Sequence, residues 1–249
     1  MRFKSIFASM FALSIGLATI PAQAETLRVG TEAQGIPFTF LNEQNELDGF
    51  MVDLIKAVGQ KAGFDVQMEP MEFSALIASV GAGKIDLISA AMYITEKREE
   101  VIDFSQPVYS YGEGMIVKKD DTKEYKSFKE LEGETVGAQL GTVYVAPLEE
   151  AGIFSEVKVY NTIPEIMNDV NAGRIKAGFA DYPIMSYYLG LGQFPEVRLV
   201  KSYEPVLPGK IGIATKEGDT ERMTKINAAI DELKKSGELD KMIEKWGLK

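Results

Sequence analysis

The 249-residue chain contains neither cysteine nor histidine. The lack of cysteine excludes disulfide bonds, thiolate metal ligands and cysteine nucleophiles. The lack of histidine excludes a Ser-His-Asp triad and every histidine-ligated metal site. These two absences remove most classes of hydrolase, and the sequence predicts no cofactor and no metal site.

Basic residues are scarce relative to acidic ones, with 27 Lys and Arg against 37 Asp and Glu and a net charge of −10. Residues 1–24 hold two basic and no acidic side chains, so the net charge of the remainder is −10 − 2 = −12. This acidity argues against nucleic acid, and against an anionic membrane surface, as a partner. After residue 24, no apolar run is long enough to cross a bilayer.

The N-terminus has the three parts of a secretory signal peptide. Arg2 and Lys4 supply positive charge, residues 6–20 form an apolar core, and Ala22-Gln23-Ala24 gives the small-residue cleavage pattern. A membrane anchor is the alternative, but the core is short for a span and the Ala-x-Ala ending favours cleavage. We expect cleavage after Ala24. Since no cysteine follows that could carry a lipid, we expect an unanchored protein in a Gram-negative periplasm.

The first part of the mature chain alternates between strand and helix patterns. Strands are predicted at residues 26–30, 66–68 and 85–91, with helices over 49–62 and 73–80. This order favours an α/β fold with a parallel sheet. Ligands on such sheets bind at the carboxyl ends of the strands, and Glu32, Gly35, Phe73 and residues 90–98 fall near those ends.

A second series of strands and helices begins after a charged loop that ends near Lys126. Its elements are predicted at 115–118, 135–138, 157–160, 164–172 and 177–180, with Asp181 at the carboxyl end of the last strand. Strands at 197–203 and 211–215 follow, then a helical segment from 219 that breaks at Ser236-Gly237. We therefore predict two αβ lobes, one of residues 25–112 with 204–249 and one of residues 113–203. Crossings near 110–115 and 201–205 would form a double hinge that closes a cleft.

The stretch from Asp86 to Arg98 carries the clearest chemical signal. Its apolar start is typical of a buried strand, and Thr95 is a good N-cap for the helix that follows. Arg98 falls in the first turn of that helix, where the partial positive charge of the N-terminus disfavours a cation unless an anion lies beside it. The anion is either Glu99 or Glu100, or the carboxylate of a ligand held by Arg98 and by backbone N–H groups.

Motifs along the whole mature chain point to one family. The motifs of the first lobe are Gly49-Phe50, Asp53, Phe73, Lys84-Ile85-Asp86, residues 94–98 and Asp103-Phe104-Ser105. Those of the second lobe are Val136-Gly137, Leu140-Gly141-Thr142, Gly173-Arg174-Ile175 and Asp181. The last is Gly237 to Trp246, which matches a closing helix. In these motifs the chain resembles the periplasmic polar-amino-acid-binding proteins of ABC importers (bacterial solute-binding protein family 3). The resemblance implies a two-lobed type II periplasmic-binding-protein fold. It also implies a monomer that captures a small zwitterion and delivers it to the membrane subunits of an ABC importer.

The resemblance assigns roles to individual positions. Arg98 would bind the α-carboxylate of an amino-acid-like ligand, with N–H donors from Thr142 or Val143. Asp181 would take the α-ammonium group, and the ring of Phe73 would cover the ligand. These roles are chemically consistent, because a zwitterion needs one cation and one anion in a dry cleft where both interactions are strengthened.

Five positions depart from, or add to, the usual pocket. Gly35 stands where the family often has a stacking Tyr or Phe. Ala90-Ala91 stands where Gly or Ser is common, and Tyr93 where Ser or Thr is common. We hypothesise that the Tyr93 ring replaces the missing one. Glu32 stands where binders of basic amino acids carry an acid, which indicates a cationic ligand; a solvated or loop-capping Glu32 is the alternative.

Two other functions remain open. One is a periplasmic enzyme on the same scaffold, similar to cyclohexadienyl dehydratase, in which Glu32 or Asp181 is held protonated as a general acid. The other is a sensor module that docks to a separate receptor kinase. The ligand receptor is favoured, because the chain combines a signal peptide, two lobes and an anion-binding turn without a catalytic triad.

Overall fold

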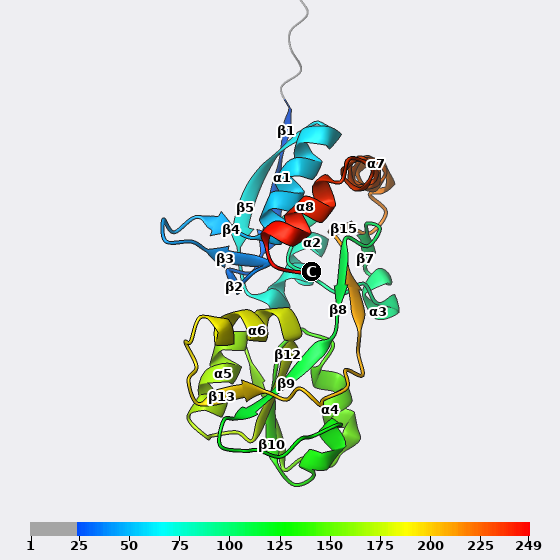
Figure 1. Cartoon of the computed structure of the whole chain (residues 1–249). Coiled ribbons are helices and arrows are strands. Elements are labelled where there is room, and N and C mark those ends of the chain that lie inside the picture. Colours follow the sequence, from blue (N-terminus) through cyan, green and yellow to red (C-terminus); the bar gives the residue numbers. More distant parts are fainter. Residues whose placement is uncertain (1–23) are drawn as a thin grey trace, which may run out of the picture.

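Two five-stranded sheets lie at opposite ends of the molecule and form the centres of two lobes (Figure 1). The structure, a computed structural model, describes residues 24–249. Residues 1–23, which hold nearly all of the predicted signal peptide, lie outside the described part. Within residues 24–249, no helix is long and apolar enough to cross a membrane.

The first lobe is built on a sheet with the strand order β5-β1-β6-β15-β7. Strands β1, β5 and β6 are parallel, whereas β15 runs antiparallel to both of its neighbours. The strands are β1 (Glu25–Thr31), β5 (Phe64–Pro70), β6 (Leu87–Ile88), β7 (Ile102–Phe104) and β15 (Ala214–Lys216). The helices of this lobe are α1 (Phe50–Ala62), η1 (Phe73–Ala75), α2 (Leu76–Gly81), α3 (Glu96–Glu99), α7 (Thr220–Ser236) and α8 (Glu238–Lys245). A small sheet joins β2 (Gln34–Gly35), β3 (Thr39–Leu41) and β4 (Leu47–Asp48).

Helix α1 illustrates how the sequence pattern produces this lobe. Leu54, Ile55 and Val58 recur at helical spacing and are fully buried. The helix ends at Gly63, which takes the left-handed φ of 83° that a C-cap requires. At its other end Asp53 accepts hydrogen bonds from Trp246 and Lys245 of the C-terminal segment. The first and last segments of the lobe are therefore tied together.

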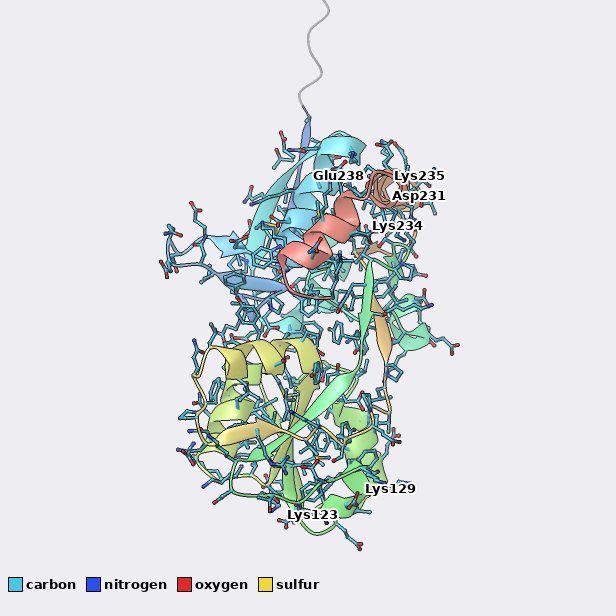
Figure 2. All side chains as sticks on the ribbon, in the orientation of Figure 1. Lys123, Lys129, Asp231, Lys234, Lys235 and Glu238 are labelled. Carbon is cyan, nitrogen blue, oxygen red and sulfur yellow. The ribbon has the colours of Figure 1, made fainter. Side chains whose placement is uncertain are left out.

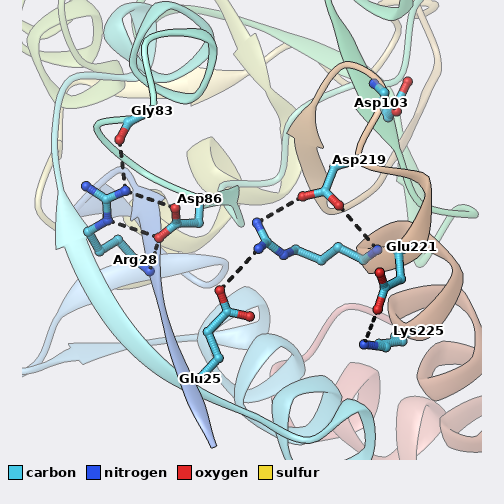
Figure 3. A network of polar contacts seen from close by, with 10 residues as sticks. Glu25, Arg28, Gly83, Asp86, Asp103, Asp219, Glu221 and Lys225 are labelled. Carbon is cyan, nitrogen blue, oxygen red and sulfur yellow. Dashed lines mark hydrogen bonds and ion pairs between the residues drawn. The ribbon is translucent and has the colours of Figure 1, made fainter.

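The start of β6 is fixed by an ion pair on the lobe's edge (Figure 3). Arg28 donates from Nε and Nη2 to the two carboxylate oxygens of Asp86, at 3.0 and 2.9 Å, and from Nη2 to the carbonyl of Gly83 at 2.8 Å. These bonds hold the turn after α2 against β1, so the chain enters β6 in a fixed register. In a second network Arg222 forms ion pairs with Glu25 and Asp219, both of which are labelled in Figure 3.

The second lobe is built on a sheet with the strand order β11-β10-β12-β9-β13. Strands β11, β10 and β12 are parallel, and β9 runs antiparallel to β12 and β13. The elements are β9 (Glu113–Lys118), η2 (Phe128–Leu131), β10 (Thr135–Gln139), α4 (Val145–Ala151), β11 (Glu156–Tyr160), α5 (Ile163–Asn171), β12 (Ala177–Asp181), α6 (Tyr182–Gly190) and β13 (Val197–Leu199). Helix α5 begins with a capping box, in which Thr162 and Glu165 each accept from the other's backbone N–H.

Two extended segments connect the lobes. Strands β8 (Tyr109–Tyr111) and β14 (Gly209–Ile211) pair antiparallel to each other, outside both large sheets. The buried Glu113 then joins the two crossings, because its carboxylate accepts from the Tyr203 hydroxyl and from the backbone N–H groups of Val206 and Leu207. The two connections are thus linked to each other as well as to the lobes.

Three predicted strands differ in the structure. Residues 211–215 were predicted as one strand but belong to two, because β14 pairs with the hinge strand β8 and β15 pairs with β6 and β7. The predicted strand 197–203 is a strand only at residues 197–199, and the predicted strand 85–91 is a strand only at residues 87–88. Apolar sequence predicts burial in all three places but does not say which residues find a backbone partner. Residue 211 pairs with the hinge strand β8, and residues 214–215 pair within the sheet of the first lobe.

Charged side chains project from the outer ends of the molecule. In Figure 2 the labelled Lys123 and Lys129 lie at the far end of the second lobe, and Asp231, Lys234, Lys235 and Glu238 lie on or beside α7 and α8 at the opposite end.

Candidate functional site

A small cavity lies between the lobes and encloses about 20 Å³, which is room for about one water molecule. The lobes are therefore closed on each other. The cavity is lined by Glu32, Phe73, Ala91, Tyr93, Arg98, Tyr111, Gln139, Thr142, Val143, Tyr144 and Asp181. They come from the carboxyl ends of strands in both lobes and from the hinge strand β8, as expected for an α/β sheet.

Arg98 occupies the first-lobe side of the cavity. It follows the N-cap Thr95, whose hydroxyl accepts from the Arg98 backbone N–H at 3.3 Å, so the predicted cap is present. The guanidinium donates to the carbonyl of Tyr93 at 2.6 Å and, across the cleft, to the carbonyl of Gly141 at 2.9 Å. Its carbon lies 5.8 Å from the ring centre of Phe73.

No carboxylate of the described residues lies within ion-pair distance of the Arg98 guanidinium, although Arg98 is only 8% exposed. Glu99 and Glu100 therefore do not supply the anion. Burial lowers the pKa of Arg98, because the charged form has lost water. A buried guanidinium bonded only to carbonyl oxygens is a ready partner for an anionic group.

Asp181 occupies the second-lobe side, at the end of β12. Its two oxygens accept hydrogen bonds from the hydroxyls of Tyr144 at 2.5 Å and of Tyr111 at 2.9 Å. Within residues 24–249 it forms no ion pair. Burial raises the pKa of Asp181 to about 6, although the two phenols and the charge of Arg98 oppose this rise. Two opposite charges thus line one cavity without pairing to each other.

Three tyrosines surround Asp181. Burial and the negative charge of Asp181 raise the pKa of Tyr93, Tyr111 and Tyr144, so all three remain neutral donors. The Tyr93 hydroxyl donates to the carbonyl of Tyr111 at 2.8 Å. The Tyr93 ring packs over Gly209, where a larger residue would collide with it.

Glu32 lies on the first-lobe side and reaches across the cleft. It is 8% exposed and accepts a 2.7 Å hydrogen bond from Gln139 Nε2, which also donates to the carbonyl of Asn161. Burial raises the pKa of Glu32 to about 7, against the lowering effect of the Gln139 bond. Glu32 is thus neither solvated nor a cap on its own loop, which were the alternatives left open by the sequence.

Of the remaining predicted positions, three line the cavity and one does not. Thr142 and Val143 line the cavity after β10, and Ala91 lines it with a left-handed φ of 51°, a strained conformation for a residue with a side chain. Gly35 is not among the lining residues. It lies buried in β2, where an added Cβ would come within 3.4 Å of Ile184 on α6. A Cβ there would make only ordinary van der Waals contacts, so Gly35 takes no part in the cavity as the structure shows it.

Three lining residues were not predicted. Gln139 is the last residue of β10, so the rule that ligands bind at strand ends could have found it. Tyr144 follows the Leu140-Gly141-Thr142 turn by two residues and could have been found from that turn. Tyr111 belongs to the hinge strand β8, and no local pattern places a hinge side chain inside the cleft.

Comparisons with known proteins agree on one family. The profile described as "Bacterial extracellular solute-binding proteins, family 3" matches residues 27–249. The chain is similar to the probable amino-acid-binding protein YxeM of Bacillus subtilis (strain 168), with 29% identity over 97% of this chain and 91% of that protein.

Solved structures of two ancestral proteins are also similar. An ancestral arginine-binding protein bound to arginine matches with a TM-score of 0.83 and 37% identity, over 90% of this chain and 99% of that one. The ancestral amino acid-binding protein AncCDT-1, a precursor of cyclohexadienyl dehydratase, matches with a TM-score of 0.79 and 32% identity, over 89% and 95%.

Proposed function

We propose that this chain, which belongs to family 3 of the bacterial extracellular solute-binding proteins, captures an amino acid between its lobes and delivers it to the membrane subunits of an ABC importer. The observation that carries the proposal is the pair of opposite charges in one cavity. Arg98 is buried and Asp181 is half-buried, and neither has an ion-pair partner among the described residues. A zwitterionic ligand would supply both partners at once.

In this proposal the ligand carboxylate lies at Arg98. The guanidinium would exchange its bonds to the carbonyls of Tyr93 and Gly141 for a charge-assisted pair. The backbone N–H groups of Thr142 or Val143 would add donors from the second lobe, and the Phe73 ring would cover the ligand. The ligand ammonium lies at Asp181. Each lobe therefore holds one end of the ligand, so binding favours the closed form.

Glu32 supports a ligand with a cationic side chain. The cavity lining carries one basic residue, Arg98, and two acidic residues, Asp181 and Glu32. An amino acid with a net positive charge would balance that set, and its side-chain donors would satisfy the buried Glu32 carboxylate. Binding such a cation would also lower the pKa of Glu32 from about 7.

We also propose where the protein acts and how the chain is divided. Export to the periplasm with cleavage after Ala24 is supported by the signal-peptide pattern. Lobe boundaries at 112/113 and 203/204 are supported by the division of the strands between the two large sheets. We propose that the protein works as a monomer, since residues from the two lobes of a single chain are enough to enclose the cavity.

A dehydratase is the second candidate. It is favoured by the raised pKa of Asp181, about 6, which suits a general acid, and by the similarity to AncCDT-1. Turnover of prephenate or arogenate by the purified protein would support it, and the absence of product at high enzyme concentration would remove it.

The receptor proposal is tested by a thermal-shift screen on protein that has been unfolded, dialysed and refolded to remove bound ligand. The panel comprises the L-amino acids, opines and polyamines. A ligand at a hundredfold excess over its Kd adds about 2.7 kcal/mol of stability, a rise in Tm of about 5–10 °C for a protein of this size. Basic amino acids are expected to give the largest shifts. If no zwitterion shifts the Tm, the proposal is wrong.

A further inference from the structure

We infer that Gln139 is a specificity-determining residue that, together with Glu32, selects ligands whose side chain ends in at least two N–H donors. This role rests on the proposed function, because it takes the cavity between the lobes as the place where an amino acid binds. It extends that proposal from the charge of the ligand side chain to the hydrogen bonds that this side chain donates. Two acceptor atoms without a donor carry the inference.

The amide of Gln139 has a fixed orientation. Its Nε2 atom donates to Glu32 Oε1 at 2.7 Å and to the main-chain carbonyl of Asn161 at 2.9 Å. A carbonyl oxygen can only accept a hydrogen bond, so the amide atom that faces Asn161 must be the nitrogen. These two bonds use both N–H groups of the amide. The Gln139 side chain therefore has no donor left and can offer a ligand only its oxygen, Oε1.

Two acceptor atoms beside this amide have no donor among residues 24–249. They are Gln139 Oε1 and the second carboxylate oxygen of Glu32, since the Gln139 bond goes to Oε1 of Glu32. Both side chains line the cavity, and Gln139 is only 2% exposed. Within the same residues, Thr215 Oγ1 is the one fully buried side-chain polar atom without a partner. The two oxygens are therefore not sealed inside the protein but open on the cavity.

The other side chains in the lining do not satisfy these two acceptors. Each hydroxyl group of the lining already donates its proton to an oxygen atom of the protein; these groups belong to Tyr93, Tyr111, Thr142 and Tyr144. Arg98 donates to main-chain carbonyls and, within the described part of the chain, makes no hydrogen bond or ion pair with Glu32 or Gln139. The donors for the two open oxygens must therefore come from a ligand or from water.

A ligand side chain satisfies both acceptors only if it carries two or more N–H groups at its end. An ammonium group has three N–H donors and a guanidinium group has five. Methylation of an ammonium group keeps its positive charge, and so its attraction to Glu32, but removes one donor for each methyl group. A ligand without these donors would leave two buried acceptors unpartnered, which weakens binding because both have lost water. The pair of acceptors thus distinguishes ligands that charge alone does not.

The two acceptors come from different lobes. Glu32 follows β1 in the first lobe, and Gln139 is the last residue of β10 in the second. A ligand side chain that donates to both therefore bridges the cleft. A ligand of the same charge with too few donors would contact one lobe only through these groups, so it would favour the closed form less.

The test is isothermal titration calorimetry of the refolded mature protein at pH 8, where the carboxyl of Glu32, with its pKa of about 7, is mostly ionised. The first series is L-lysine with its Nε-monomethyl, dimethyl and trimethyl derivatives. The second is L-ornithine with the corresponding Nδ derivatives, and L-arginine is measured beside them. Within a series the charge is constant while the number of N–H donors falls from three to none. We expect the monomethyl member to bind within threefold of its parent and the trimethyl member at least tenfold more weakly.

Gln139→Met separates hydrogen bonding from ligand size. Methionine has a similar length but carries neither an amide oxygen nor an N–H group. The ratio of the Kd values of the trimethyl member and its parent should therefore fall at least threefold, whereas an effect of size would leave that ratio unchanged. Tyr188→Phe is the matched control, since it removes a hydrogen bond between the lobes, to the Gln34 carbonyl, outside the cavity lining. It should leave the ratio as in the wild-type protein.

The outcomes separate this inference from the receptor function. A trimethyl member that binds as tightly as its parent, or a tightest ligand without side-chain N–H groups, would overturn the inference and leave the receptor standing. An unchanged ratio in Gln139→Met would overturn the role of Gln139. If circular dichroism shows that this variant does not fold, the wild-type series decides alone.

Two further results are decisive. If only L-arginine binds, Gln139→Met should weaken its binding at least tenfold and Tyr188→Phe less than threefold; equal effects would overturn the inference. If no amino acid binds in this assay or in the wider screen, the inference and the proposed function both fail.

Discussion

Glu32 in the first lobe and Gln139 in the second share a 2.7 Å hydrogen bond across the cleft. Arg98 makes a second such bond to Gly141, and Tyr188 a third to Gln34. The first two of these bonds involve cavity-lining side chains that a ligand would itself use. A ligand therefore adds affinity only to the extent that its own bonds exceed those it replaces.

Replacing Arg98 by alanine is expected to abolish detectable amino-acid binding. The substitution leaves the ligand carboxylate without its cation, a loss of roughly 2–5 kcal/mol. Calorimetry measures the affinity, and far-UV circular dichroism shows whether the fold is retained. Arg98→Lys is the control, because it keeps the charge but lacks the planar fork and should bind with intermediate affinity. Unchanged affinity in Arg98→Ala would refute the assigned role.

The ligand-free protein should be more closed at acid pH than at alkaline pH. The pKa of Glu32 is raised to about 7 and that of Asp181 to about 6 by burial in the closed cleft. Both carboxyls therefore bind protons more tightly when closed than when hydrated at their ordinary pKa of about 4. The closed form is favoured below about pH 4, and this advantage is lost as the pH rises to about 7.

Small-angle X-ray scattering would measure this effect as a smaller radius of gyration at pH 5 than at pH 8. For Glu32 alone the change corresponds to about 3 kcal/mol at most. Glu32→Gln should reduce the pH dependence to the part that Asp181 contributes, since an amide does not titrate. A radius that stays constant in the wild-type protein from pH 5 to pH 8 would contradict the prediction.

Gly141→Ala should weaken ligand binding by obstructing closure. Gly141 has a φ of 81°, and a Cβ there would lie 2.8 Å from the Cα of Ser74 in the other lobe. Gly152→Ala is the matched control, because Gly152 has a φ of 63° in the same lobe with no atom within 4 Å of its added Cβ. Both variants carry backbone strain of about 1 kcal/mol. Only Gly141→Ala should lose affinity, by tenfold or more; equal affinities would mean that the lobes close less tightly in the bound state.

Asp169 should stabilise the second lobe at neutral pH. Its carboxylate accepts from Tyr160, Lys158 and Arg174, and these bonds lower its pKa to about 2. A lowered pKa gives stability that is present above about pH 4 and is lost as the pH falls toward 2. Because both cationic partners are partly exposed to solvent, we expect about 1–2 kcal/mol.

Urea unfolding of Asp169→Asn would measure this contribution. The variant should lose about 1–2 kcal/mol of unfolding free energy at pH 7 and much less near pH 2.5. Asp120→Asn is the control, since Asp120 is exposed on the same lobe and forms no ion pair within residues 24–249. A loss that does not depend on pH would indicate a packing effect instead of a charge effect.

The sequence predicted those features that depend on local chemistry. The cap at Thr95, the end of α1 at Gly63 and the break at Gly237 follow from conformational preferences of single residues. The gathering of Glu32 and Arg98 at one edge follows from parallel strands, whose carboxyl ends share that edge.

Features that depend on the hinge could not be predicted in this way. The division of residues 211–215 between β14 and β15 is decided by partners more than 100 positions earlier, such as Tyr109 and Asp103. Tyr111 enters the cleft because β8 crosses between lobes, and Gln139 meets Glu32 only when the lobes close. These relationships are properties of the closed molecule, and no local spacing encodes them.

The placement of β15 between β6 and β7 also determines the order in which the chain can fold. Thr215 pairs with Leu87 and Asp103, so the first lobe's sheet stays divided until almost the whole chain is available to fold. The second lobe's strands lie between residues 113 and 199. That lobe can therefore complete its sheet while the sheet of the first lobe still lacks β15. The lobe that begins the sequence should therefore be the later one to become native, and its late, long-range pairing should limit the folding rate.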